Sequence, residues 1–255
     1  MKIAVVGGTG LTGGHVVAQL LAAGREVSIV ARSRGVDLIT GSGLDTALAG
    51  ADVTIDVTSV TTIKGKESVN FFTTAGSNLL AAAEKAGVGH HIALSIVGVD
   101  RVKYGYYDGK LRQEELVRAA PIPWTILRAT QFHEFAGQFL ERIPGPFALG
   151  PRLRTQPIAV AEVAQHLVDL AGQEPRQMAP ELAGPRVELL SDRVRRLLHA
   201  RGQHRPVVPL WMPGAGFRAI AEGGLLPEGP GPRGKQSFDE WMAEKYPATA
   251  GRNVD

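Results

Sequence analysis

The sequence contains no cysteine among its 255 residues. Disulfide bonds, zinc sites built on thiolates and cysteine nucleophiles are therefore excluded. It also lacks an apolar run of the roughly 18 residues that a membrane-spanning helix needs, because Asp52 and Asp56 interrupt the apolar stretch 46–63. The opening "MKIAVVGG" has no long apolar core of the kind found in secretion signals. We therefore expect a cytoplasmic protein without a membrane span.

Several catalytic signatures are also missing. There is no G-x-S-x-G, which argues against an α/β-hydrolase, and no H-E-x-x-H of a zinc protease. Gly13 is followed by Gly14 and His15 instead of the lysine of a triphosphate-binding loop. His90 and His91 are adjacent, so on a strand they would point to opposite faces. We expect no metal site.

The numbers of positively and negatively charged residues are nearly equal. The formal net charge is +3, and aromatic residues make up 6% of the chain. The most basic stretch, residues 186–205, places Val194, Leu197 and Leu198 on one helical face and arginines on the other. This pattern is typical of a solvated helix, and few aromatic residues are available to stack on bases. We expect a small-molecule substrate and no nucleic-acid partner.

Short apolar strands and helical stretches alternate through the first half of the chain. The strands are expected at 2–7, 26–32, 36–40, 52–59, 91–98 and 124–130, and the helices at 15–24, 69–88 and 109–120. Strand–helix–strand alternation with short connections is typical of a parallel sheet covered by helices on both faces. The sequence therefore predicts an α/β fold with a Rossmann-type, doubly wound parallel sheet.

Beyond about residue 140, proline and glycine are frequent and the periodic stretches are shorter. We expect helices at 160–172, 191–200 and 237–246, a strand at 186–190, and mostly loop at 213–234. Ser191 is the expected N-cap of its helix, and Ser237 with Glu240 forms a capping-box pattern. This half lacks a continuous core of its own. The prediction is one domain, 1–255, with a small C-terminal α/β lobe built mainly from 130–255.

The densest glycine segment is "VVGGTGLTGG", residues 5–14. Gly8, Gly10 and Gly13 match G-x-G-x-x-G, and Gly7, Gly10 and Gly13 match G-x-x-G-x-x-G. The segment lies between an expected strand and an expected helix, which is the context of a dinucleotide-binding turn. The helix N-terminus offers N–H groups to the phosphates. The expected cofactor-binding residues of this turn are Gly7, Thr9, Gly10, Leu11, Thr12 and Gly13.

The end of the second strand, "IVARSRGVD", bears on the choice of cofactor. NAD-binding proteins usually have an acidic residue there that holds the ribose 2′-hydroxyl. This sequence has Arg32, Ser33 and Arg34 instead. A guanidinium group pairs with a 2′-phosphate through charge-assisted hydrogen bonds. The pattern favours NADP(H), the alternative being that these are ordinary surface arginines.

Four further segments carry a family resemblance when taken with the glycine run. They are "AGADVTIDVTS", "LLAAAEKAGVGHHIALSIVGVD", "GYYDGKLRQEELVRAAPIPWTILRATQFHEF" and "EWMAEK". The chain resembles the atypical short-chain dehydrogenase/reductases, and within these the NmrA-like, NAD(P)H-binding oxidoreductases. The resemblance covers essentially the whole chain. It implies a single NAD(P)-binding Rossmann domain whose lobe binds the substrate, and it leaves the reaction open.

The resemblance also implies a catalytic set of Tyr-x-x-x-Lys and an upstream hydroxyl. Tyr106 and Lys110 match the pair, which would share one helical face, and Ser95 matches the hydroxyl. A neighbouring ammonium would lower the tyrosine pKa. Tyr106 would then protonate a carbonyl oxygen, Ser95 would donate a hydrogen bond to the oxyanion, and Lys110 would also hold the nicotinamide ribose. The alternative is a binding or structural role for Tyr106 within its tyrosine cluster.

The remaining site residues follow the ends of two later strands. Thr58 and Ser59 would line the cofactor, because the sequence has no Asn-Ala-Gly segment there. By resemblance, Ala129, Thr130, Gln131 and Phe132 would approach the nicotinamide and the substrate. The candidate apolar wall of a substrate pocket comprises Phe132, His133, Phe135, Trp211, Met212 and Phe217, although each could equally belong to the core. Asp52 and Asp56 are given no catalytic role.

The leading functional hypothesis is an NADPH-dependent oxidoreductase. It would reduce a carbonyl, enone or quinone of a small hydrophobic or aromatic substrate. One alternative is an NADP(H)-binding sensor that regulates a protein partner without turnover. Another is a sugar-nucleotide epimerase-like enzyme that reuses its bound cofactor. The retained Tyr106 and Lys110 favour an enzyme. Monomer and homodimer both stay open.

Overall fold

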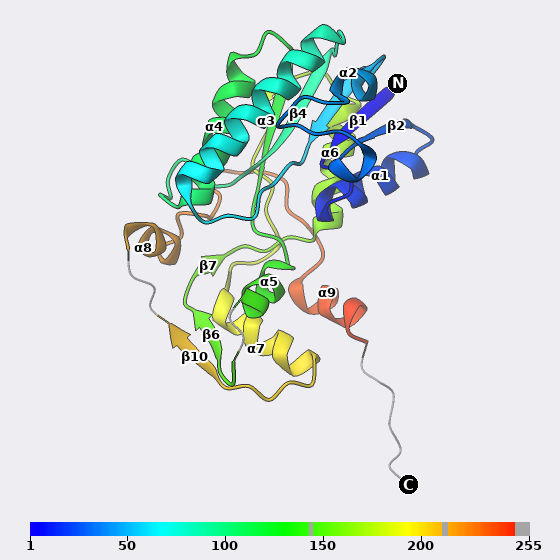
Figure 1. The fold of residues 1–255 in the computed structure, drawn as a ribbon. Coiled ribbons are helices and arrows are strands. Elements are labelled where there is room, and N and C mark those ends of the chain that lie inside the picture. The colour runs from blue at the N-terminus through cyan, green and yellow to red at the C-terminus, as the bar shows by residue number, and fades with distance from the viewer. Residues whose placement is uncertain (143–144, 211–213, 248–255) are drawn as a thin grey trace.

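A six-stranded parallel sheet forms the centre of the molecule in this computed structural model, which describes residues 1–142, 145–210 and 214–247. Across the sheet the strands run β2 (Glu26–Val30), β1 (Lys2–Val6), β3 (Val53–Asp56), β4 (His90–Ile96), β5 (Trp124–Ala129) and β8 (Gln177–Met178). All neighbouring pairs are parallel. The carboxyl ends of the strands therefore meet at one edge (Figure 1).

Helices cover both faces of this sheet, as the sequence predicts. Ile3 and Val5 of β1 face α1 (Leu11–Ala22) and α6 (Val160–Ala171) in one apolar cluster. The alternate residues, Ala4 and Val6, face a second cluster on the opposite side. There the helices are α2 (Leu44–Leu48), α3 (Gly65–Lys85) and α4 (Gly105–Ala119). The doubly wound arrangement is confirmed.

The strand expected at 36–40 is wrong. Asp37 Oδ1 accepts hydrogen bonds from the backbone N–H groups of Ile39 and Thr40 at 2.7 and 3.3 Å, which turns the chain instead of extending it. Asn78 of α3 holds this turn by donating to the carbonyl oxygens of Leu38 and Ile39, both at 2.9 Å. The sixth strand of the sheet is β8, which comes from the second half of the chain.

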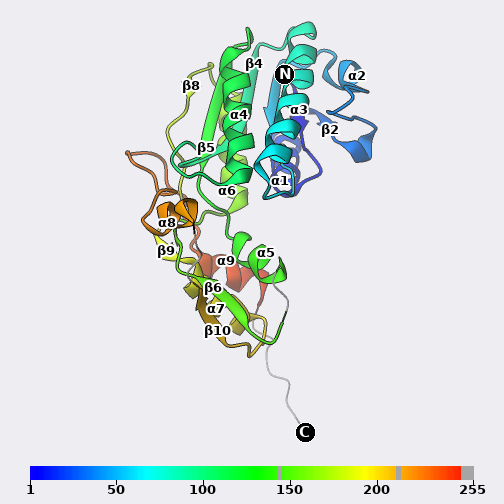
Figure 2. The same cartoon turned by 60° about the vertical axis from the view of Figure 1, so that its left-hand side comes forward.

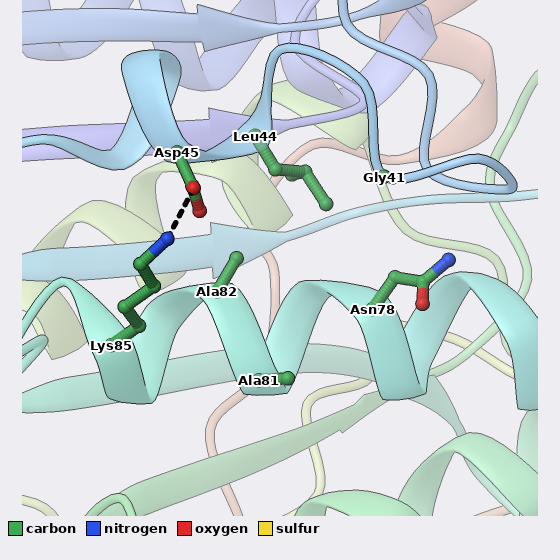
Figure 3. Close-up of a pocket in the computed structure, with 7 residues that line it drawn as sticks. All are labelled: Gly41, Leu44, Asp45, Asn78, Ala81, Ala82 and Lys85. Carbon is green, nitrogen blue, oxygen red and sulfur yellow. Dashed lines mark hydrogen bonds and ion pairs between the residues drawn. The ribbon is translucent and has the colours of Figure 1, made fainter.

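A small pocket lies between α2 and α3, next to this turn (Figure 3). It is lined by Gly41, Leu44, Asp45, Asn78, Ala81, Ala82 and Lys85. Lys85 Nζ forms an ion pair with Asp45 Oδ2 at 2.5 Å across its end. Together with the bonds from Asn78, this contact fastens α2 and the preceding turn to α3.

The second half forms a lobe around a third apolar cluster, below the sheet in Figures 1 and 2. Its helices are α5 (Phe135–Arg142), α7 (Leu190–Ala200), α8 (Ala215–Ala221) and α9 (Phe238–Lys245). Its strands pair as β6 (Ala148–Pro151) with β10 (Val207–Leu210), and β7 (Arg154–Thr155) with β9 (Glu188–Leu189). However, α6 covers one face of the sheet and β8 is one of its strands. The chain therefore leaves the lobe to form these two elements and then returns to it.

Two helix starts in the lobe test the expected caps. Ser237 caps α9, with Glu240 N donating to its hydroxyl at 3.3 Å and Ser237 N donating to the Glu240 carboxylate at 2.7 Å. The cap expected from Ser191 is wrong, because Leu189 occupies the N-cap position and Ser191 is buried in the first turn of α7. In addition, the region expected as mostly loop contains α8.

Three helices of the first half begin earlier than the sequence indicates, and the first of them, α1, begins at Leu11. α3 begins at Gly65 and α4 at Gly105, so Tyr106 lies in the first turn of α4 with Lys110 one turn later. Among the described residues, no helix is long and apolar enough to cross a membrane.

Candidate functional site

The glycine run forms a tight turn between β1 and α1. Gly7 has a positive φ of +82°, which glycine adopts without strain, and Gly10 N donates to Gly7 O at 2.9 Å. A Cβ on Gly13 would lie 2.2 Å from Gly7 O and 2.6 Å from the Cα of Gly8. Only glycine at position 13 therefore lets the helix lie this close to the turn.

The start of α1 suits a pyrophosphate. Its N-cap is Gly10, no side chain of the described residues caps it, and its first turn contains no acidic residue. The first N–H groups of a helix need acceptors, and the positive end of the helix dipole favours an anion. The cradle left by the glycines and this uncapped helix start therefore fit the phosphates of a dinucleotide.

Basic side chains stand beside this turn. The 3-10 helix η1 (Arg32–Arg34) follows β2, and Ser33 Oγ lies 3.5 Å from Thr9 Oγ1 of the glycine turn. Arg32 and Arg34 are exposed, and their side chains make no hydrogen bond or ion pair with the described residues. The next acidic residue, Asp37, uses its carboxylate to hold its own turn. Two guanidinium groups are thus available to an anion here.

Asp56, the last residue of β3, anchors a buried polar chain. Its Oδ1 accepts from Thr58 N at 2.9 Å, and its Oδ2 accepts from Gln113 Nε2 at 2.6 Å. The side chain is only 2% exposed. The sequence analysis gave Asp56 no role and did not single out Gln113. Two signals were present: Asp56 ends an apolar strand, and Gln113 follows Lys110 by three residues on one helical face.

Lys110 is buried at the other end of this chain. Its Nζ donates to Leu94 O of β4 at 2.6 Å and to Gln113 Oε1, and it lies 5.1 Å from the centroid of the Phe72 ring. Because Gln113 donates to Asp56 and accepts from Lys110, the amide orientation is fixed. Burial lowers the pKa of Lys110 to about 8, although the charges of Asp56 and Glu114 oppose this shift.

Tyr106 contacts a different partner from the one expected. Its hydroxyl and the Ser59 hydroxyl lie 2.9 Å apart, and its ring packs edge-on against Phe72. Burial raises the Tyr106 pKa, and the hydrogen bond with Ser59 opposes this rise. The expectation that Lys110 lowers this pKa is wrong, because the Lys110 ammonium is bonded to Leu94 and Gln113. In the described part of the chain no hydrogen bond joins Tyr106 to Lys110.

Ser95 stands one residue beyond the carbonyl that binds Lys110. It lies near the end of β4 and is 3% exposed, and its Oγ has no hydrogen-bond partner among the described residues. A buried hydroxyl without a partner is uncommon in proteins. Ser95 therefore offers a free donor beside Lys110, although no hydrogen bond between described residues joins it to Tyr106.

Of the residues after β5, Thr130 has a structural role, whereas Gln131 has no role that the structure assigns. Ala129 ends the strand, and the Thr130 hydroxyl donates to Gln156 O at 2.5 Å and accepts from Gly184 N at 3.3 Å. The hydroxyl of Thr130 therefore fastens this segment to the second half of the chain. Next to it, both amide atoms of Gln131 are buried without a partner among the described residues.

His133 is fully buried between sheet and lobe. Its Nε2 lies 3.1 Å from Gln236 O, and its ring packs against Phe238 and Trp241, each 5.7 Å away between centroids. Burial lowers the His133 pKa to about 4, so the ring is neutral at neutral pH. Phe132 packs against the core of the sheet.

The four other members of the expected apolar wall belong to the lobe or fall outside the described residues. Phe135 and Phe217 pack within the lobe cluster, where the rings of Phe217 and Tyr104 lie 5.8 Å apart. Trp211 and Met212 lie outside the described residues.

A parallel doubly wound sheet, a glycine turn and an uncapped helix start beside basic residues define a dinucleotide-binding Rossmann protein. The chain belongs to the NAD(P)H-binding family, whose model matches residues 7–174. This span begins in the glycine turn and includes Asp56, Tyr106 and Lys110. This match confirms NAD(P)H as the class of cofactor that the sequence predicts.

Comparison with solved structures supports the same fold. UDP-glucose 4-epimerase from Thermotoga maritima is 16% identical, with a TM-score of 0.70 over 86% of this chain and 88% of that one. The Thermus thermophilus UDP-glucose 4-epimerase complex with NAD is 19% identical, with a TM-score of 0.67 over 98% and 95%. An NADPH-dependent quinone oxidoreductase from Escherichia coli is 19% identical, with a TM-score of 0.65 over 96% and 99%.

At these identities the likeness concerns the fold alone. A comparison with curated proteins finds no match.

Proposed function

We propose that this protein is an NADPH-dependent oxidoreductase that reduces a carbonyl, enone or quinone. The observation that carries the proposal is that two pairs of hydrogen-bonded polar side chains lie at the carboxyl edge of the sheet. One is Tyr106 with Ser59, and the other is Lys110 with Gln113, which continues to Asp56. Asp56 is the register partner of Val6, the residue before the glycine turn. Both pairs thus lie beside the strand that leads into the dinucleotide site.

The residues present fit the cofactor along its length. The glycine turn and the start of α1 would hold the pyrophosphate, and Arg32 and Arg34 would hold the 2′-phosphate. Thr58 and Ser59 would line the middle of the cofactor, and Lys110 would reach the nicotinamide ribose. When bound, NADPH supplies a hydride to the carbon of the substrate.

Tyr106 would supply the proton. Its raised pKa keeps the hydroxyl protonated at neutral pH, so the proton is available when negative charge develops on a substrate oxygen. Ser59 orients this hydroxyl at 2.9 Å. The free hydroxyl of Ser95 would donate a second hydrogen bond to the same oxygen. The buried charge of Lys110 would stabilise the developing negative charge in surroundings that exclude water.

The test is NADPH consumption against a panel of quinones, enones and aromatic ketones. For a substrate that is turned over, Tyr106→Phe should lower kcat by about 10² to 10⁴, the usual contribution of a positioned acid. NADPH affinity, measured by fluorescence titration, should change by less than about twofold, because the phenolic proton serves the substrate. Unchanged turnover in Tyr106→Phe would remove the tyrosine from the mechanism.

Sugar-nucleotide epimerisation is the second candidate, because two of the similar structures are UDP-glucose 4-epimerases. The test is to incubate the protein with UDP-glucose, without adding an excess of cofactor. Chromatography then measures how much of the C4 epimer is formed. A chain that binds NADPH tightly and is silent in both assays would be assigned as a sensor.

A further inference from the structure

Arg193 is a fully buried arginine in the lobe. It lies on α7, its exposed fraction is 0%, and its Cζ lies 5.5 Å from the centroid of the Phe238 ring on α9. One nitrogen, Nη2, donates to Thr155 Oγ1 at 2.9 Å. The other two, Nε and Nη1, have no hydrogen-bond acceptor among the described residues. Most of the hydrogen-bonding capacity of this guanidinium is therefore unused.

No carboxylate of the described residues compensates its charge. Arg196, one turn further along α7, pairs with Glu188 and with Asp239, the latter at 2.7 Å. Arg193 forms no ion pair within the described part of the chain. Glu134, the first acidic residue after β5, does not pair with it. An uncompensated buried charge is strongly destabilising. Burial lowers the Arg193 pKa only to about 9, so the group is still a cation at neutral pH.

Other buried polar atoms without a partner lie near the end of β4 and on the segment that follows β5. They are Ser95 Oγ, both amide atoms of Gln131, His133 Nδ1 and Glu134 Oε2, among the described residues. His133 packs on the same ring, Phe238, as Arg193 does, and the Arg193 charge contributes to its lowered pKa. Ser95 lies near the carboxyl end of β4 and the other three residues follow β5. They therefore stand at the edge at which ligands bind in open α/β sheets.

We propose that Arg193 is the anchor for an anionic group, a carboxylate or a phosphate, carried by the substrate of this protein. The proposal rests on the proposed function, because it places the reducible group at Tyr106 and Ser95 and the anionic group at Arg193. A guanidinium presents paired N–H groups that match both anions in bidentate geometry. The stacked rings of Phe238 and Trp241, 5.4 Å apart, add an apolar surface near this anchor. The substrate class is thus an acidic carbonyl compound with an apolar or aromatic body.

Thermal unfolding without cofactor tests the anchor independently of turnover. Inorganic phosphate and benzoate are each titrated against chloride at equal ionic strength. A ligand that binds only the folded state raises Tm with the logarithm of its concentration. We expect one of the two anions to raise the wild-type Tm in this way. A response to phosphate alone that Arg193→Met loses identifies a phosphate ligand, because phosphate bound at the glycine turn would act equally on both proteins. A response to benzoate alone identifies a carboxylate. If neither anion raises Tm beyond chloride, the proposal is overturned.

Arg193→Met and Arg195→Met form a matched pair of variants. Arg195 lies on the same helix but is half exposed and paired with Asp192. Arg195→Met should keep the anion response, and Arg193→Met should lose it. In chloride, Arg193→Met should unfold no earlier than wild type, because replacing an unpaired buried charge with an apolar side chain relieves its burial cost. An anion response kept in Arg193→Met, or a Tm in chloride well below that of Arg195→Met, would show a purely structural arginine.

Arg193→Lys covers the case in which the methionine variant does not fold. Lysine keeps the charge but loses the planar fork, so the anion concentration that gives a set rise in Tm should increase about tenfold. An unchanged concentration would contradict the assignment. On a substrate found in the panel, Arg193→Met should raise the KM of the free acid about 10- to 100-fold and that of its methyl ester less than about twofold. Because the Tm shift needs neither NADPH nor turnover, the two proposals fail separately.

Discussion

Arg32 and Arg34 are exposed near Thr9 of the glycine turn, and their side chains form no ion pair or hydrogen bond within the described part of the chain. In the proposed cofactor site they lie where the adenosine ribose would be. Changing both to alanine should weaken NADPH binding about 10- to 100-fold, the value of lost charge-assisted hydrogen bonds. NADH lacks the 2′-phosphate, so its affinity should change by less than about twofold. Fluorescence titration with both cofactors measures the two values. Equal weakening of NADH and NADPH would mean that the arginines do not select the cofactor.

Lys110 makes the stability of the protein depend on alkaline pH. Its pKa is about 8 in the folded chain against 10.5 in the unfolded one, so the unfolded state binds more protons between these values. Stability should therefore rise as pH increases through this window, by at most roughly 3 to 4 kcal/mol at about 1.4 kcal/mol per pKa unit. Below pH 8 both states carry the charge and the burial cost is present in full.

Lys110→Met should lack this alkaline gain. Denaturant unfolding of wild type and variant, at a series of pH values from 7 to 10.5, gives the difference. Only the difference between the two curves is interpreted, because other groups titrate in both proteins. Parallel curves would place the Lys110 pKa near its ordinary value and remove the effect of burial.

The residue types of the site could be predicted from the sequence, but the direction of each side chain could not. The Tyr-x-x-x-Lys spacing correctly places both residues on one helix. It does not reveal that Lys110 bonds to Leu94 and Gln113, because those contacts depend on the packing of α4 against β4. Likewise, burial by Phe72 and its neighbours raises the Tyr106 pKa, and burial is a property of the folded chain.

At the scale of elements, the contact between α1 and the glycine turn leaves no room for a side chain at Gly13. Gly13→Ala would place a Cβ 2.2 Å from Gly7 O, so either the turn or the helix must shift. Overpacking of this kind costs about 1 to 3 kcal/mol. We expect Gly13→Ala to lose that amount of unfolding free energy in denaturant and to bind NADPH more weakly.

Gly14→Ala is the matched control for this substitution. A Cβ on Gly14 meets no atom within 4 Å, and the residue lies in the same helix. Alanine is favoured over glycine in helices by about 0.8 to 1.0 kcal/mol, so Gly14→Ala should be neutral or stabilising. If the two variants lose equal stability, the close approach at Gly13 is not the cause.

Long periodic elements could be predicted, whereas short ones depended on local hydrogen bonds. The strands β1, β4 and β5 and the helix α6 follow their apolar patterns closely, whereas α1 and α3 each begin about one turn before the expected residue. The segment 36–40 has strand-like residues, but the Asp37 carboxylate holds a turn and Asn78 fixes it to α3. β8 has two exposed residues and no apolar pattern, so nothing in its sequence marks it as the sixth strand.

On the scale of the whole molecule, ionic and backbone contacts join the sheet to the lobe. Arg101, in the turn after β4, donates to Gly224 O and Leu226 O at 3.2 and 2.7 Å and pairs with Glu228 at 2.9 Å. Thr130 and His133 make the corresponding connections after β5. The lobe is therefore held against the edge of the sheet at which the candidate site lies.

The path of α6 and β8 has a consequence for exchanging parts between related chains. These two elements complete a face and an edge of the sheet, although they lie in the sequence between two stretches of the lobe. A cut at residue 140 would leave β5 as a bare edge and α1 without its neighbour. A chimera that transfers substrate preference must therefore be assembled from two grafts, 131–157 and 184–247, around a retained 158–183. A chimera made with a single crossover would gain a new lobe, but it would also exchange α6 and β8, which belong to the cofactor-binding scaffold.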